Sequence, residues 1–174
     1  MFALFGQRKK GTSPMSLSRP QLIATLEQTP STLAHLTSTL TDSALDFHSG
    51  PDEWSIREIL AHLVDDEMFV MRTRMERMMK EEGPSLASHD EKKWYAQRNT
   101  SRDTISELLH DFAQQRAASL GILTLLRDKD WTRTAFHPEY GHFTAEAWLG
   151  SWVEHDLVHI RQIEQARATM EQSA

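Results

Sequence analysis

The sequence predicts an all-α fold, and more specifically a four-helix bundle. Four segments carry apolar residues at the three- and four-residue spacing of amphipathic helices, and no segment shows the sustained alternation that indicates a β-strand. The chain has 174 residues, which suffices for one hydrophobic core and is short for two. Four amphipathic helices without a sheet to cover are expected to bury their apolar faces against one another.

The first helix is expected over residues 19 to 41, with a proline in its middle. Pro30 lacks a backbone donor and crowds the preceding turn, so it is expected to kink the helix or to restart it. In the second case Thr29 would cap the new start. Residues 1 to 17 are interpreted as a flexible tail, and residues 18 to 174 as a single helical domain.

The second helix is expected to begin at Ser55, because Ser55 and Glu58 have the spacing of a capping box. It should end near Lys80, before a Glu-Glu-Gly-Pro sequence. The polar connection of residues 81 to 101 can reach about 60 Å when extended, whereas a helix of this length measures about 38 Å. The connection can therefore cross the bundle, which permits an up-down-down-up topology in which helices two and three are parallel.

The third helix is expected over residues 103 to 127 and the fourth over residues 144 to 169. Between them lies a segment containing HPEYGH, which is interpreted as a loop. His137 and His142 flank this loop and are expected mainly to shape it. The remaining isolated histidines have no partner at a useful spacing and are interpreted as surface or boundary residues; they are His35, His48, His89 and His110.

Composition excludes several classes of function. A net charge of −6 disfavours general nucleic-acid binding, which needs a surplus of Lys and Arg. The chain contains no Cys, so thiolate nucleophiles and Cys-ligated zinc are excluded. No apolar run approaches the roughly 20 residues that span a bilayer. We therefore expect a cytoplasmic protein that binds neither nucleic acid nor membranes.

The fourth helix carries two histidines on its apolar side. His155 and His159 are four residues apart in SWVEHDLVHIRQIEQ, which places both side chains on one face. A single such histidine is more often a hydrogen-bonded core residue, but a pair at this spacing suits a shared metal ion. His62 lies at the rim of the second helix's apolar face and is predicted to be the third ligand. Three histidines leave coordination positions open, as in reactive metal sites.

Carboxylates near these histidines have several interpretations. Asp66, Glu67 and Asp156 are candidates to orient the imidazole rings through hydrogen bonds. Asp156 is also a candidate ligand. Glu67 falls near the centre of the second helix's apolar face and Arg116 near that of the third, so the two are predicted to form a buried ion pair. The alternative is that the Arg116 stem extends to solvent and Glu67 lies in a wet groove.

Two motifs together give the chain a family resemblance. WSIREILAHLVDDE, followed about 90 residues later by HDLVHIRQI, resembles the DinB/YfiT-like superfamily of small bacterial four-helix proteins, over about residues 20 to 165. The resemblance implies an up-down-down-up bundle with a long crossover between helices two and three. It also implies a metal triad at His62, His155 and His159, and places the family's acidic residue and Arg at Glu67 and Arg116.

The resemblance and the histidines predict a divalent-metal enzyme. The ion is expected to be Zn²⁺ or Ni²⁺, with Mn²⁺ and Fe²⁺ as alternatives. Some members resemble metal-dependent transferases that use a low-molecular-weight thiol, so an S-transferase acting on a small electrophile is the favoured reaction. A hydrolase that activates water is one alternative, and a stress-associated metal- or ligand-binding bundle without enzymatic activity is another. A homodimer is expected.

Overall fold

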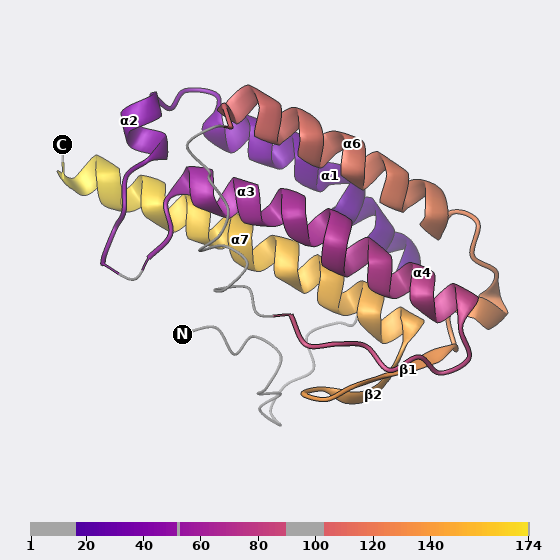
Figure 1. The fold of residues 1–174 in the computed structure, drawn as a ribbon. Helices are drawn as coiled ribbons and strands as arrows, with labels where there is room; N and C mark the ends of the chain where they lie inside the picture. Colours follow the sequence, from indigo (N-terminus) through magenta and orange to yellow (C-terminus); the bar gives the residue numbers. More distant parts are fainter. Residues whose placement is uncertain (1–16, 52, 90–102, 174) are drawn as a thin grey trace.

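The computed structural model describes residues 17–51, 53–89 and 103–173, and it shows a bundle of long helices with a small hairpin at one end (Figure 1). The bundle helices are α1 (Arg19–Thr37), α3 (Ile56–Asp66), α4 (Arg72–Lys80), α6 (Ile105–Leu123) and α7 (Ala145–Ser173). A five-residue π-helical segment, Glu67–Met71, joins α3 to α4 in one continuous rod. Smaller elements are α2 (Asp42–Leu45), a 3₁₀ turn (Asp128–Asp130), β1 (Thr134–His137) and β2 (Gly141–Thr144).

The topology is up-down-down-up, as the family resemblance implies and as the length of the connection after Lys80 permits. Figure 1 shows α1 and α7 running in one direction and α3–α4 and α6 in the other. The helix α1 packs against α6 and α7, and α3 packs against the same two helices from the other side. Because α4 and α6 are parallel, the connection between Lys80 and Ile105 returns along the bundle. Residues 90–102 of this connection, like the predicted tail at residues 1–16, lie outside the described residues.

Pro30 neither restarts nor ends α1, contrary to one of the two sequence-based expectations. The helix is continuous from Arg19 to Thr37. A proline at position 30 leaves the carbonyl of Leu26 without its helical donor, and Nη1 of Arg116 donates to that carbonyl at 2.9 Å instead. Thr29 is not a cap: its hydroxyl donates to the Thr25 carbonyl and to Asp156. A donor from another helix thus replaces the bond that Pro30 removes.

The segment before the last helix contains a β-hairpin, where the sequence predicts only a loop. Its antiparallel register runs from Thr134 opposite Thr144 to His137 opposite Gly141. Gly141, the first residue of β2, has a φ of 71°, in the left-handed region that favours glycine. Strands of four residues are too short to give a recognisable alternation, which is why the pattern was missed. The hairpin buries Ala135 against the bundle.

The core consists of two apolar clusters with a polar layer between them. One cluster, near the hairpin, includes Leu26, Met75 and Trp148. The other, near the start of α3, includes Leu33, Leu60 and Phe112. Each helical rod of the bundle contributes buried polar residues to the layer between the two clusters. They are Thr29 of α1, His62, Asp66 and Glu67 of the α3–α4 rod, Arg116 of α6, and Asp156 and His159 of α7.

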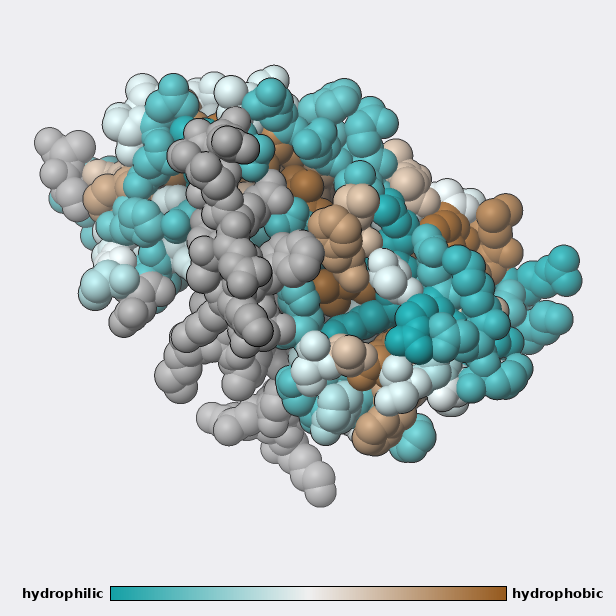
Figure 2. All heavy atoms as spheres, in the orientation of Figure 1, coloured by the Kyte–Doolittle hydropathy of each residue, from teal (hydrophilic) through white to brown (hydrophobic). Residues whose placement is uncertain are grey.

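The outer surface fits this arrangement. Figure 2 shows mostly hydrophilic residues over the α4 and α6 end of the drawn face, with hydrophobic residues exposed in small separate patches. Within the described part of the chain, no helix combines the length and the apolar character needed to cross a membrane.

The capping box at the start of α3 positions the helix that carries His62, and it can be tested directly. The Ser55 hydroxyl accepts from the Glu58 amide at 3.2 Å, and the Glu58 carboxylate accepts from the Ser55 amide at 2.7 Å. Ser55→Ala should lower the free energy of unfolding by about 1 kcal/mol, measured by urea denaturation. Ser151→Ala, which removes only a hydroxyl bonded within α7, should change it little. Equal effects of the two substitutions would contradict the capping role.

Candidate metal centre

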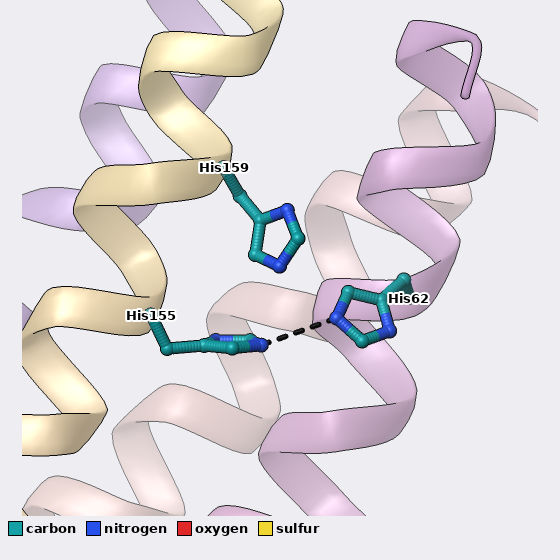
Figure 3. Close-up of side chains that lie close together, drawn as sticks. All are labelled: His62, His155 and His159. Atoms are coloured by element: carbon teal, nitrogen blue, oxygen red, sulfur yellow. Dashed lines mark hydrogen bonds between the residues drawn. The ribbon is translucent and has the colours of Figure 1, made fainter. Parts of the chain in front are cut away.

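Three histidines from two helices converge inside the polar layer. His62 projects from α3, and His155 and His159 project from α7 toward it (Figure 3). The Nε2 atoms of His62 and His155 lie 3.1 Å apart, and one nitrogen from each of the three rings lies within 4.8 Å of the others. Imidazole nitrogens bound to one Zn²⁺ at 2.0–2.1 Å are separated by about 3.3 Å in a tetrahedron. The structure thus brings together the three residues that the sequence singles out, at spacings that fit one divalent ion.

Each Nδ1 atom of the same rings lies near an oxygen of a polar side chain, at distances from 2.7 to 3.9 Å. His159 Nδ1 lies 2.7 Å from the side-chain amide oxygen of Gln162, Oε1, which makes Nδ1 the protonated nitrogen of that ring. His62 Nδ1 lies 3.7 Å from an Asp66 oxygen. His155 Nδ1 is buried without a hydrogen-bond partner, with the nearest Asp156 oxygen at 3.9 Å. With protons on Nδ1, all three Nε2 lone pairs are left to bind a metal.

The two aspartates occupy different places. Both carboxylate oxygens of Asp156 accept hydrogen bonds from Arg116, at 2.7 and 3.0 Å, and one also accepts from Thr29 at 2.8 Å. This favours an orienting role for Asp156 over the alternative role of ligand. Asp66 is also buried, but one of its oxygens lies 3.4 Å from His155 Nε2, on the side where the ring nitrogens converge. Asp66 therefore lies nearer than Asp156 to the point where the ring nitrogens converge.

Arg116 lies at the centre of the polar layer and forms the ion pair with Glu67 that the sequence predicts. Its guanidinium donates to both Glu67 oxygens, at 3.0 and 2.9 Å, as well as to Asp156 and the Leu26 carbonyl. Glu67 also accepts from the Trp152 indole at 2.9 Å. The sequence does not predict the bonds from Arg116 to Asp156 and to the Leu26 carbonyl, because a single sequence does not show which inner helix faces meet.

Three residues that the sequence analysis did not assign to the site lie near the three histidines. Gln162 follows His159 by three positions, a spacing at which it could have been recognised as a partner on the same helix. Trp54 packs its ring 4.9 Å from that of His62. His89, interpreted from sequence as a surface residue, lies 3.6 Å from Asp66. By contrast, His137 is buried under Tyr140 and shapes the hairpin turn, as expected.

Burial and nearby charges shift the pKa values of the three histidines in different directions. Burial lowers the pKa of His62 to about 4, and burial with the neighbouring imidazoles lowers the pKa of His159 well below its usual value. Burial alone would also lower the pKa of His155, but the nearby carboxylates of Asp156 and Asp66 raise it to about 9. Without metal at pH 7, His155 therefore carries the one imidazolium charge of the cluster.

A family model described as the DinB superfamily matches residues 25–163 of the chain. The chain belongs to this superfamily. The match covers most of the chain, including the three histidines, and it confirms the family resemblance that the two sequence motifs indicated.

Individual relatives agree with this assignment. The "Putative metal-dependent hydrolase YfiT" of Bacillus subtilis is 28% identical over 91% of this chain and 89% of its own length. A second "Putative metal-dependent hydrolase", from Oceanobacillus iheyensis, is 28% identical over 79% of each chain. The solved structure of YfiT, described as "a probable metal-dependent hydrolase with an unusual four-helix bundle topology", matches with a TM-score of 0.81 at 27% identity, covering 92% of this chain and 94% of that one.

Removal of the Arg116 guanidinium should destabilise the bundle strongly. Arg116→Met leaves Glu67 and Asp156 buried without a counter-charge, so the free energy of unfolding should fall by about 3–5 kcal/mol in urea denaturation. Adding Glu67→Gln and Asp156→Asn to this variant removes the uncompensated charges and should restore part of the loss. Additive losses across the three substitutions would contradict the network.

Metal binding should be coupled to a proton. A ligating imidazole must be neutral, and His155 is protonated below a pKa of about 9. The affinity for Zn²⁺ should therefore rise about tenfold per pH unit from pH 7 toward pH 9 and then level off. Calorimetry at pH 7 in buffers with different ionisation enthalpies should show about one proton released per ion. An affinity independent of pH over this range would contradict the assignment to His155.

Proposed function

We propose that the protein is a metal-dependent hydrolase whose divalent ion is held by His62, His155 and His159. The observation that carries the proposal is the convergence of three buried imidazoles, with each Nδ1 atom near an oxygen of a polar side chain. The names of two relatives as metal-dependent hydrolases support it. Three protein ligands leave room for water, and a bound ion would lower the pKa of that water toward neutrality.

The chain's own residues then have distinct tasks. Gln162 and Asp156 fix the orientation of the α7 imidazoles, Gln162 by a hydrogen bond of 2.7 Å and Asp156 by its charge at 3.9 Å. Asp66 is buried, with one oxygen 3.4 Å from His155 Nε2. Its carboxylate is placed to accept a hydrogen bond from the attacking nucleophile and so to orient it. The apolar clusters on either side restrict the access of bulk water to the centre.

Three neutral imidazoles favour borderline ions, so we propose Zn²⁺ or Ni²⁺ as the native metal, with Fe²⁺ and Mn²⁺ as alternatives. The substrate is proposed to be a small molecule with an electrophilic carbon. The thiol-dependent S-transferase favoured from the sequence remains the second candidate. It shares the same ion and differs in the nucleophile, and the relatives' names favour water. A homodimer and a cytoplasmic location stay predictions.

Metal content tests the site itself. Protein purified without a histidine tag should contain about one divalent ion per chain by elemental analysis. His62→Ala and His155→Ala should each lower this to near zero, whereas His110→Ala, at an exposed position of α6, should leave it unchanged. Protein that holds no ion even after incubation with Zn²⁺, Ni²⁺ and Mn²⁺ would refute the metal-dependent function.

The choice of nucleophile can be tested on the metal-loaded protein with a panel of esters, amides and alkyl halides. A hydrolase turns over substrate without added thiol and incorporates ¹⁸O from labelled water into the product. Asp66→Asn should reduce this turnover by at least a hundredfold while metal content is retained. Turnover that requires a thiol and yields a thioether would support the S-transferase and contradict the hydrolase.

A further inference from the structure

A cavity lies beside the three-histidine centre, between the segment that precedes α3 and the C-terminal half of α7. It has a volume of about 260 Å³. Its polar and aromatic lining consists of Ser49, Glu53, Trp54, Gln162, Gln165 and Thr169. Cavities that hold whole drug-sized ligands measure about 300–1,000 Å³, so this one suits a single functional portion of a substrate.

Two lining residues also touch the histidines. The Trp54 ring centroid is 4.9 Å from that of His62, and the side-chain amide oxygen of Gln162 is 2.7 Å from His159 Nδ1. One layer of side chains thus separates the cavity from the centre. The cavity and the centre are therefore adjacent, with Trp54 and Gln162 in contact with both.

The charge of the lining is one-sided. Glu53 contributes a carboxylate that forms no hydrogen bond or ion pair with another described residue, and none of the described Lys, Arg and His residues lines the cavity. Trp54, its neighbour in the chain, contributes an aromatic face. A carboxylate next to an indole is a combination that attracts an ammonium group, through Coulomb attraction and the negative ring face. An anion would meet only repulsion from Glu53.

Gln162 adds a hydrogen-bond donor to the cavity. Because its side-chain amide oxygen accepts from His159, its NH₂ group is left as a donor, and no described residue accepts from it. That donor suits a hydroxyl or carbonyl oxygen of the ligand. The cavity therefore offers a cation site at Glu53 and a donor at Gln162, nearer to the histidines.

We infer that this cavity binds the protonated amine portion of a small substrate, with a neighbouring oxygen of the substrate held by Gln162. As a description of the substrate, the inference rests on the proposed function, since the reacting bond would lie at the three-histidine centre. As a description of a binding site, it requires no turnover.

The test is an NMR titration of the full chain at pH 7 with three probes of equal length and different charge: 3-amino-1-propanol, 1,3-propanediol and 3-hydroxypropanoate. The cation should bind saturably and shift the Trp54 indole and Gln162 side-chain resonances, with an affinity at least fivefold above that of the other two probes. Glu53→Gln should weaken its binding at least fivefold. Glu164→Gln, at an exposed position of α7 outside the cavity, makes the same charge change and should leave binding unaltered.

Equal responses to the three probes, no response to the cation, or unchanged binding in Glu53→Gln would each overturn the inference. Since the readout is binding, its failure is distinct from failure of the proposed hydrolase. If the chain binds the amine but hydrolyses nothing, the amine site stands and the proposed hydrolase is wrong. If it hydrolyses a substrate but does not bind the amine, the proposed hydrolase stands and the amine site is wrong.

Discussion

Arg116 joins all four helices of the bundle through one guanidinium group. It donates to the Leu26 carbonyl of α1, to Glu67 in the π-helical segment and to Asp156 of α7, while its own backbone lies in α6. A buried cation of this kind is costly unless every donor finds an acceptor. That requirement fixes how the helices are placed along and around one another, and it separates the core into two apolar clusters with a polar layer between them.

The same network reaches the candidate metal centre by two routes. Asp156 is held by Arg116 on one side and presents its charge to His155 on the other. Asp66 and Glu67 are consecutive and both buried, yet Asp66 faces the histidines and Glu67 faces Arg116. The helix changes from α to π at this point, and π-helical turns inside α-helices often occur at functional sites. Structure and site therefore share one set of buried polar residues.

Much of this was predictable from the sequence, for identifiable reasons. Helical periodicity and the Ser55–Glu58 spacing predict the helices, and the length of the connection after Lys80 permits the parallel pair. The i, i+4 spacing of His155 and His159 predicts a shared face. The contribution of Asp156 to the Arg116 network was beyond prediction, since it depends on how three helices meet. The replacement of the Pro30 hydrogen bond by Arg116 depends on the same tertiary contact, and the hairpin strands were too short to give a pattern.

In the proposed metal centre, three imidazoles would bind one ion through Nε2 while Nδ1 faces Asp66 in His62, Asp156 in His155 and Gln162 in His159. Long-range ¹H–¹⁵N NMR of the histidine rings, before and after addition of Zn²⁺, tests it most directly. One equivalent of Zn²⁺ should shift the Nε2 resonances of His62, His155 and His159 together and leave all three rings protonated on Nδ1. A response from fewer than three of these rings, or a metal-bound Nδ1 in any of them, would contradict it.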